Sequence, residues 1–335
     1  MKTGSSKNKY ILMLALTSFI WGSAFVAQDI GSEYIGAYSF TGIRFLIGAF
    51  VLLPVILIRK YTGKRGLPAE TVGDKNSQTV FSKYPLITGG IVCGILLCLA
   101  SNLQQIGIAV GSSVGKASFL TSTYIVLVPI LEYSVFKHRV RMNIWIAVVL
   151  AMAGLYLMCM SGTETIEKGD AFILGCAISF AFQILALSYF APKCDPLELS
   201  CLEFTVCGVI SCVIMCFTDI RALGLNEWLN TITLQPALIA LLYAGVFSSG
   251  VAYTLQVVAE KDLQASVASL IFSTESIFAA LSALVILGQR MSTREIMGSV
   301  LIFSAVIVSA WSKEIKDDKT KAVKAAEPKI KEGLG

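Results

Sequence analysis

The chain has 335 residues, of which 55% are hydrophobic and only 15% carry a charge, and its mean hydropathy is +0.73. A soluble domain of this length needs more charge to cover its surface, so the composition excludes an ordinary soluble globular protein. The net charge of +5 comes mostly from lysines and arginines beside apolar segments. This placement is typical of membrane loops that face anionic lipid, and it does not indicate nucleic-acid binding.

Taken in chain order, about ten apolar stretches are long enough for a bilayer-spanning helix, which needs roughly 20 residues. They lie at 10–28, 36–58, 86–107, 114–136, 143–160, 170–190, 199–218, 236–258, 264–287 and 295–312. The alternating pattern of a membrane barrel is absent, so an all-α polytopic membrane protein is expected. No small-residue cleavage pattern follows the first stretch, which predicts that it is retained as a helix.

Residues 94–156 align with residues 245–307 without a gap, and the alignment keeps polar residues inside two apolar stretches. Gln105 falls on Gln256, and Ser122-Thr123 falls on Ser273-Thr274. Weak repeats of this kind are typical of secondary transporters, whose two halves move about a shared site near the membrane midplane. An odd number of helices per repeat requires that the two repeats be inverted. The pattern therefore predicts ten transmembrane helices built as two inverted five-helix repeats, at 10–160 and 170–312.

Lysine and arginine predict the orientation of the helices. Basic residues concentrate in the N-terminal segment 1–9, in the loop 60–85, after the fourth apolar stretch and in the tail 313–335. We therefore expect both termini to be cytoplasmic and the protein to lie in the plasma (cytoplasmic) membrane. Arg290 and Arg294 fall on the opposite side and disagree with this count. The tail lacks aromatic residues and is expected to be disordered.

No enzyme or metal site is predicted. The nine cysteines form no CxxC pair, and the chain has one histidine, so neither a metal-ligand set nor a Cys/His dyad can be assembled. Nucleotide-binding and hydrolase motifs are also absent. We expect no catalytic residue, no metal and no cofactor.

Several short motifs occur in a characteristic order along the chain. They are Trp21-Gly22, Arg44-Phe45, Thr121-Ser122-Thr123-Tyr124 followed by Pro129, Gly245 to Tyr253, Ser273-Thr274-Glu275, and Gly288-Gln289-Arg290. Over residues 10–312 the chain thereby resembles the drug/metabolite transporter superfamily, specifically its duplicated EamA type. This resemblance implies a ten-helix, inverted-repeat carrier, commonly an exporter of amino acids, related metabolites or toxic compounds, with central helices around one cavity.

Polar side chains in lipid are costly, so those within the apolar stretches are the candidate lining of a substrate cavity. The substrate-binding candidates are Trp21, Asn102, Gln105, Thr121, Ser122, Gln183, Tyr253, Gln256, Ser273 and Thr274. The alternative is that they join helices through hydrogen bonds worth about 0.6 kcal/mol each.

Three charged residues are candidates for proton or charge coupling. Glu275 lies near the middle of its stretch, where desolvation disfavours the charged carboxylate and would let it exchange a proton. Arg44 could form a structural pair with Glu275 or bind a substrate carboxylate. Lys116 could attract an anionic substrate or extend to the membrane surface. Glu132 and Glu203 are expected to reach the surface from the ends of their helices.

These observations predict a secondary active transporter of small organic metabolites, such as amino acids, related compounds or drugs. It would be a proton-linked exporter that works by alternating access. An importer or exchanger of sugars or other polar metabolites is the alternative, and a membrane scaffold or interaction protein is the non-transport alternative. The expected partners are the lipid bilayer and a small-molecule substrate, with no nucleic acid, and a homodimer is left open.

Overall fold

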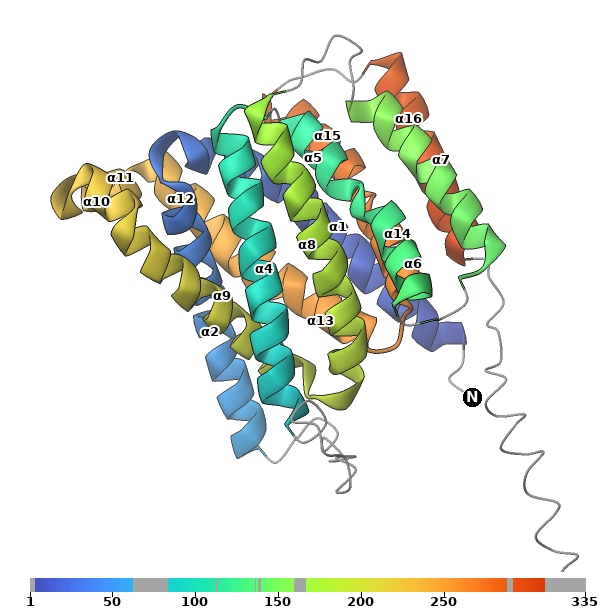
Figure 1. The fold of residues 1–335 in the computed structure, drawn as a ribbon, viewed down its shortest axis with the longest axis horizontal. Helices are drawn as coiled ribbons and strands as arrows, with labels where there is room; N and C mark the ends of the chain where they lie inside the picture. The colour runs from blue at the N-terminus through green and yellow to red at the C-terminus, as the bar shows by residue number, and fades with distance from the viewer. Residues whose placement is uncertain are drawn as a thin grey trace, which may run out of the picture.

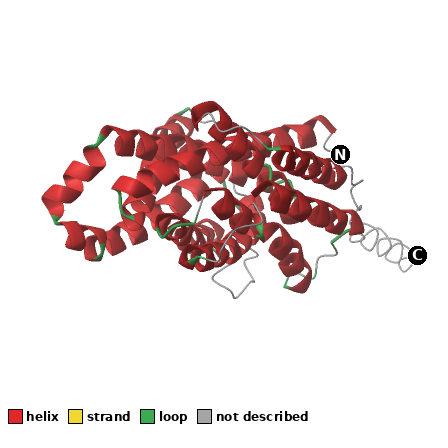
Figure 2. Cartoon of the chain, turned by 90° about the horizontal axis from the view of Figure 1, so that it is seen from above, coloured by secondary structure: helices red, strands yellow, loops and turns green. Residues whose placement is uncertain are grey.

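A computed structural model of the chain (Figure 1) describes residues 4–62, 84–112, 114–135, 137, 140–159, 167–287 and 292–310. Its elements, in chain order, are α1 (Gly4–Tyr34), α2 (Ala37–Tyr61), α4 (Pro85–Ala109), α5 (Val114–Ser122), α6 (Tyr124–Ser134), α7 (Met142–Cys159), α8 (Lys168–Phe190), η1 (Ala191–Lys193), α9 (Pro196–Phe217), α10 (Asp219–Leu223), α11 (Leu225–Thr233), α12 (Gln235–Tyr243), η2 (Ala244–Tyr253), α13 (Thr254–Glu260), α14 (Ala265–Phe272), α15 (Glu275–Leu287) and α16 (Thr293–Ala310). The described residues form only helices joined by short connections, as Figure 2 shows. Most of the predicted loop 60–85 and all of the predicted tail 313–335 lie outside them.

Within the described residues, nine segments are long and apolar enough to cross a membrane. They are Asn8–Tyr34, Ala37–Tyr61, Pro85–Ala109, Gly115–Ser134, Met142–Cys159, Lys168–Lys193, Pro196–Leu223, Gln235–Glu260 and Ala265–Ser282. Each coincides with one predicted stretch, although α1 continues past residue 28 to Tyr34. The tenth predicted stretch, 295–312, coincides with α16, which is not one of these nine.

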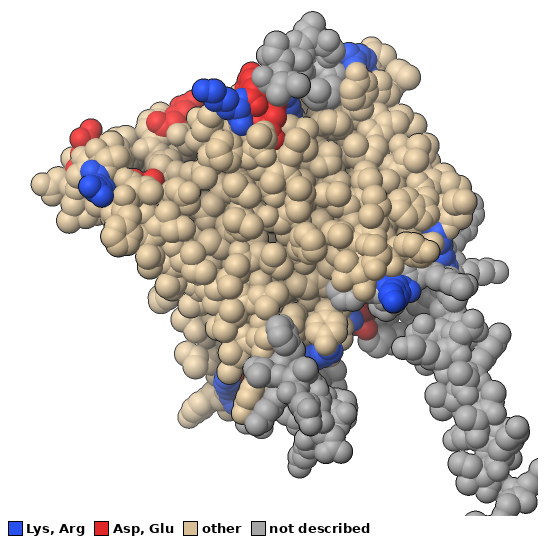
Figure 3. Space-filling view, viewed as in Figure 1, with Lys and Arg blue, Asp and Glu red and all other residues tan. Residues whose placement is uncertain are grey.

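Charged side chains gather at two opposite ends of the molecule, and Figure 3 shows a broad band without charge between them. At one end, Arg59 Nη2 lies 3.1 Å from Asp195 Oδ2, and Lys60 Nζ lies 3.0 Å from Glu198 Oε1. These two ion pairs join the end of α2 to the start of α9. A band of apolar surface between two charged ends is what a bilayer requires, so this is an integral membrane protein.

Two of the predicted continuous helices are interrupted near their middle. The stretch 114–136 consists of α5 and α6, which meet at Thr123. The stretch 264–287 consists of α14 and α15, separated by Ser273 and Thr274. The stretch 236–258 is also divided, because η2 is a π-helical segment between α12 and α13. Insertions of π-helix are rare and frequently occur at functional sites.

The sequence did not indicate α10 and α11, which follow the seventh predicted stretch and lie at one end of the molecule (Figure 1). Both helices form hydrogen bonds to Ser39 at the start of α2. Asp219 Oδ2 accepts hydrogen bonds from the backbone N–H of Ser39 at 2.8 Å and from its hydroxyl at 2.7 Å. Trp228 Nε1 donates to the same hydroxyl at 2.9 Å.

Close packing between helices depends on small residues. α7 and α16 lie side by side in Figure 1, and they cross where Gly154 faces Gly298. A Cβ on Gly154 would lie 2.7 Å from the carbonyl oxygen of Gly298, too close for any side chain. In the same way, Gly94 of α4 lets the backbone of α9 approach at Glu203. Because lipid supplies no hydrophobic driving force between helices, such contacts gain their energy from dispersion across closely approaching backbones.

Candidate functional site

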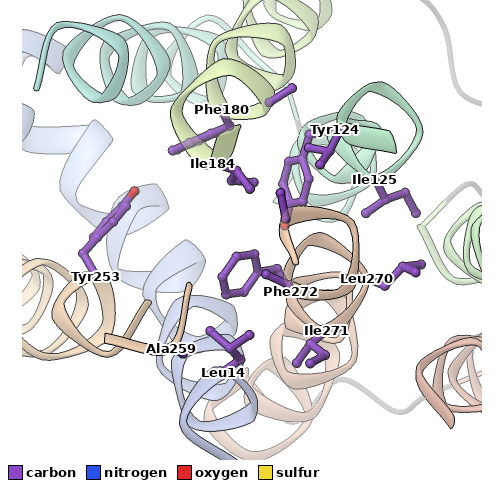
Figure 4. Packing of buried hydrophobic residues seen from close by; sticks show 14 of the residues in the cluster. Leu14, Tyr124, Ile125, Phe180, Ile184, Tyr253, Ala259, Leu270, Ile271 and Phe272 are labelled. Atoms are coloured by element: carbon purple, nitrogen blue, oxygen red, sulfur yellow. The ribbon is translucent and has the colours of Figure 1, made fainter. Parts of the chain in front are cut away.

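A small cavity of about 30 Å³ lies between the helices, and both halves of the chain contribute to its lining. Figure 4 shows residues of α6, α8, η2 and α14 approaching one region, namely Tyr124, Phe180, Ile184, Tyr253 and Phe272. The full lining consists of Trp21, Ala24, Phe25, Gln28, Arg44, Gln104, Thr121, Tyr124, Phe180, Gln183, Ile184, Ser248, Tyr253, Gln256, Phe272 and Glu275. A pocket that is mostly apolar, with a few polar groups, is the usual form of a small-molecule site.

Aromatic rings form one wall of this cavity. The ring of Trp21 lies 4.6 Å from that of Tyr253 and 5.1 Å from that of Phe272. Tyr253 also contacts Phe45, at 5.5 Å between ring centroids. Trp21 Nε1 is buried and has no hydrogen-bond partner. The wall therefore offers a flat apolar surface and one unused donor to whatever occupies the cavity.

Arg44 brings a positive charge to the cavity without a carboxylate to balance it. The residue is 2% exposed, and its guanidinium carbon lies 4.8 Å from the ring centroid of Phe45 and 5.8 Å from that of Phe40. Its Nε and Nη2 atoms are buried and make no hydrogen bond. Aromatic rings stabilise a buried guanidinium only in part, and its unused N–H donors carry a desolvation cost. The site is therefore suited to an anion.

Glu275, at the start of α15, brings an acid to the same cavity. Its Oε1 accepts a hydrogen bond from the hydroxyl of Ser122 at 3.1 Å, across the contact between α5 and α15. Tyr124 lines the same cavity. No ion pair joins Glu275 to Arg44, both of which the structure describes, so the structural pair that the sequence allowed is not formed.

Four glutamine side chains complete the polar lining. Gln104 Nε2 donates to Thr121 Oγ1 at 3.2 Å, and Gln256 Nε2 donates to Gln183 Oε1 at 3.4 Å. Gln28 Oε1 and Gln256 Oε1 are buried acceptors without a partner. The cavity thus presents unused donors at Trp21 and Arg44 and unused acceptors at these two amides.

The structure brings some of the predicted residues together and leaves others apart. Those in the lining are Trp21, Arg44, Thr121, Gln183, Tyr253, Gln256 and Glu275, and Ser122 touches the lining through Glu275. Asn102 instead donates to Ser211 Oγ at 2.8 Å, which joins α4 to α9, and Gln105 donates to the backbone oxygen of Gln28 at 3.0 Å.

Three further candidates lie outside the lining. Ser273 and Thr274 donate hydrogen bonds to carbonyl oxygens of the preceding helix α14, at Leu270 and Ile271. Lys116 Nζ lies 2.7 Å from Asp170 Oδ2 in a buried ion pair between α5 and α8. The bonds of Ser273 and Thr274 are of a common kind, since serine and threonine hydroxyls in helices often bond to a carbonyl oxygen three or four residues earlier, which slightly destabilises the helix there.

Sequence reasoning missed part of the lining. Phe180, Phe272 and Ile184 are apolar residues in apolar helices, and nothing in the sequence separates those that face the cavity from those that face lipid. Gln28 could have been found, because an amide within an apolar stretch is a signal of the kind used for the other candidates.

The expectation that Glu132 and Glu203 reach the surface is wrong. Glu203 is 0% exposed, and Gln183 Nε2 donates to its Oε1 at 2.8 Å. Glu132 is 8% exposed and accepts hydrogen bonds from the backbone N–H and the hydroxyl of Ser266. Their positions near helix ends in the sequence did not reveal that neighbouring helices cover them.

A polytopic helical protein with a cavity between its spans, lined by aromatic rings, amides and buried charges, has the architecture of a membrane carrier. The chain belongs to the EamA-like transporter family, whose sequence profile matches residues 8–160 and 167–311. It is therefore a transporter embedded in the lipid bilayer, with a small molecule as its substrate. The family match confirms the resemblance inferred from the short motifs.

Relatives agree with this assignment, and a solved structure shares the fold. The chain is 27% identical over 297 residues to an uncharacterized transporter of Archaeoglobus fulgidus, a match that covers 89% of this chain and 84% of the relative. It is 25% identical over 309 residues to the uncharacterized transporter YwfM of Bacillus subtilis, covering 90% and 93%. A protein of known crystal structure shares the fold, with a TM-score of 0.67 at 14% identity over 90% of this chain and 96% of that chain.

Proposed function

We propose that the protein is a secondary active transporter of small organic carboxylates, such as amino acids, and that it works by alternating access. Transport is proton-linked and directed outward across the plasma membrane, with both termini of the chain in the cytoplasm. The single observation that carries the proposal is the buried, unpaired guanidinium of Arg44 in the wall of the cavity.

A carboxylate is the ligand that best suits this guanidinium. Arginine presents its N–H donors in a planar fork that matches the two oxygens of a carboxylate. Two donor nitrogens of Arg44 have no partner, and none of the ion pairs between described residues includes it. A substrate carboxylate would neutralise the charge and would use both donors.

The remaining lining suits the other groups of an amino acid. The unpaired amide oxygens of Gln28 and Gln256 can accept hydrogen bonds from an amine. The rings of Trp21, Tyr253 and Phe272 can pack against an apolar or aromatic side chain. Specificity in such pockets comes from a small number of placed polar groups, while apolar contact supplies most of the affinity.

Glu275 is the proposed site of proton coupling. Its carboxylate shares the cavity with Arg44, has Ser122 as its hydrogen-bond donor and has no basic partner among the described ion pairs. Burial in a low-dielectric environment makes the loss or gain of a proton there sensitive to a charged ligand nearby. Outward transport then follows from the proton gradient, since gradients rather than structure set the direction.

The test compares carboxylates with matched carboxamides on protein reconstituted in liposomes. Amino acids and their amides are screened for substrate-induced thermal stabilisation and for currents on a solid-supported membrane, with and without a pH gradient. We expect acids to bind and amides to fail. Arg44→Met should weaken binding at least about tenfold, because hydrogen bonds to charged groups contribute about 1.5–3 kcal/mol.

Arg59→Met is the matched control, because Arg59 forms an ion pair at a helix end away from the cavity. Glu275→Gln should retain substrate binding and lose proton-linked current. Equal binding of acids and amides, or equal losses in the Arg44 and Arg59 variants, would overturn the assignment of a carboxylate substrate.

A further inference from the structure

A second group of buried polar side chains lies beside the cavity, and it contains two glutamates that do not line it. Gln183 Nε2 donates to Glu203 Oε1 at 2.8 Å, and Gln256 Nε2 donates to Glu260 Oε1 at 2.8 Å. Gln256 Nε2 also donates to Gln183 Oε1 at 3.4 Å, so the four side chains form one hydrogen-bonded chain. We call Glu203, Gln183, Gln256 and Glu260 the glutamate–glutamine chain. It joins α8, α9 and α13.

The glutamate–glutamine chain contains more hydrogen-bond acceptors than there are protein donors to pair with them. Glu203 is 0% exposed and Glu260 is 1% exposed, yet Glu203 Oε2, Glu260 Oε2 and Gln256 Oε1 have no hydrogen-bond partner. A buried acceptor that lacks a donor costs roughly 1–3 kcal/mol, and more when it carries charge. The side-chain nitrogens of Gln183 and Gln256 already donate to other oxygens of the group, so they do not pair with these three atoms. The missing component is therefore a donor or a cation.

No cation of the protein fills this role in the described residues. The ion pairs found there are Arg59–Asp195, Lys60–Glu198 and Lys116–Asp170, and none includes either glutamate. Lys193 of η1, an element that packs against α13, has its Nζ 3.1 Å from the ring centroid of Tyr189. Two uncompensated carboxylates this deeply buried would each be costly and would also repel one another.

We propose that Glu203 and Glu260 form a second proton-binding site of the transporter, separate from Glu275, in which the two carboxylates share an exchangeable proton. A proton converts a charged acceptor oxygen into a neutral O–H donor. A proton also needs no added space beside these almost fully covered side chains, whereas a larger cation would need room and further ligands. Two buried carboxylates that interact favour the uptake of one proton, because only one of them then carries a charge.

The glutamate–glutamine chain provides a connection between this proton and the substrate cavity. Gln183 and Gln256 line the cavity on one side and donate to the two glutamates on the other. Hydrogen bonds to an ionised carboxylate are stronger than those to a neutral acid, so binding of the proton would weaken the hydrogen bonds that the two amides donate to the glutamates. The proton and a ligand of the amides would then affect each other's affinity by the same factor. This coupling rests on the proposed function, whereas proton binding itself does not.

Other titratable groups interact with the pair and are included in the design of the test. They are the thiols of Cys93 on α4 and Cys207 on α9 and the phenol of Tyr124 on α6. None of them is a carboxylic acid, so the C=O stretching band of a neutral carboxyl group distinguishes the glutamates from all three.

The experiment is a pH titration by infrared difference spectroscopy on the full chain in lipid vesicles, with no substrate and no sodium. Glu275→Gln serves as the background, which removes the band of that residue. We expect a neutral carboxyl band that decreases as the pH is raised. Adding Glu203→Gln or Glu260→Gln should remove this band in both cases, because the two residues share the proton.

Glu132→Gln is the matched control, since Glu132 is also buried but bonds to Ser266 and to no member of the glutamate–glutamine chain. It should leave the titrating band in place. Each glutamine variant is first checked for a monodisperse folded protein, and either variant alone suffices if the other does not fold. A band that survives either substitution, one that does not respond to pH, or one that sodium abolishes would overturn the proposal. If the glutamine substitutions remove the band but the protein does not transport carboxylates, the proton site stands and only the proposed function is refuted.

Discussion

Thr123 and Thr274 interrupt two different helices with the same set of hydrogen bonds. Thr123 Oγ1 donates to the carbonyl oxygen of Leu120 at 2.6 Å, and Thr274 Oγ1 donates to that of Ile271 at 2.7 Å. The backbone N–H groups of the two threonines donate to the same two carbonyls, at 3.2 and 3.1 Å. The gapless alignment of 94–156 with 245–307 pairs the threonines with each other, and their acceptors as well.

These interruptions lie where the two halves of the chain meet. The hydroxyls of Ser118 and Ser276 are 2.6 Å apart, and Ser122 donates to Glu275. In Figure 1, α5, α6, α14 and α15 run beside one another. Helices that break near the centre of a membrane expose unpaired backbone groups and can bend, which is why transporters often place their binding sites there.

The contact between α7 and α16 predicts a strong effect of a single methyl group. A Cβ on Gly154 would lie 2.7 Å from Gly298 O, and one on Gly298 would lie 2.5 Å from Gly154 O. Because backbone rather than a movable side chain is in the way, Gly154→Ala should reduce the free energy of unfolding by about 1–3 kcal/mol. Thermal unfolding in detergent measures the loss.

Gly115→Ala provides the comparison, since the nearest atom to its added Cβ, Cys159 O, is 4.0 Å away. A helical glycine with free space around it should gain about 0.4–1 kcal/mol on substitution by alanine, through the unfolded state. Equal destabilisation by the two substitutions would show that helix contact at Gly154 is not the cause.

The buried pair of Lys116 and Asp170 predicts non-additive mutations. Asp170 Oδ1 also accepts from Ser112 Oγ at 3.2 Å, and its Oδ2 accepts from the backbone N–H of Glu167 at 2.9 Å. Asp170→Asn leaves the ammonium of Lys116 buried beside a neutral group and should reduce stability by about 3–5 kcal/mol. Adding Lys116→Met should restore most of that loss.

An exposed pair serves as the reference in the same unfolding assay. Lys60 and Glu198 have side chains that are 61% and 31% exposed, so Glu198→Gln should cost at most about 1 kcal/mol. If Lys116→Met does not rescue Asp170→Asn, the buried pair is not what holds α5 to α8.

The positions of nine of the ten predicted spans were predictable, because a bilayer requires long apolar runs and the sequence shows them directly. Helix interruptions were not, because Thr123 and Thr274 break their helices through hydroxyl–carbonyl bonds that apolar content does not report. The alignment of the two threonines was nevertheless visible, and it could have indicated that any interruption of one helix recurs at the same place in the other.

The candidate site was predictable only where a polar residue stands in an apolar run. Arg44, Gln183, Gln256 and Glu275 carry that signal, and all four line the cavity. The same signal selected Asn102, which joins α4 to α9 through Ser211. A polar residue in a membrane helix must find some partner, and the sequence does not say whether that partner is a neighbouring helix or a substrate.

Trp21 predicts a direct optical signal of substrate binding. Its ring lines the cavity against Tyr253 and Phe272, and its Nε1 lacks a hydrogen-bond partner. An occupant that accepts from Nε1 should shift the tryptophan emission in a saturable way. Trp21→Phe should abolish the shift, whereas Trp228→Phe should retain it, because Trp228 donates to Ser39 at one end of the molecule. A shift that survives Trp21→Phe would place the substrate elsewhere.

The contact between Ser118 and Ser276 predicts a reversible block of transport. Their hydroxyl oxygens are 2.6 Å apart, which is close enough for cysteines at the two positions to form a disulfide. In a variant that lacks the native cysteines, Ser118→Cys with Ser276→Cys should cross-link under mild oxidation and join α5 to α15. If these helices separate during the transport cycle, substrate counterflow in liposomes should stop on oxidation and return on reduction. Each single-cysteine variant should transport under both conditions, and counterflow that persists with the disulfide fully formed would mean that α5 and α15 move as one unit.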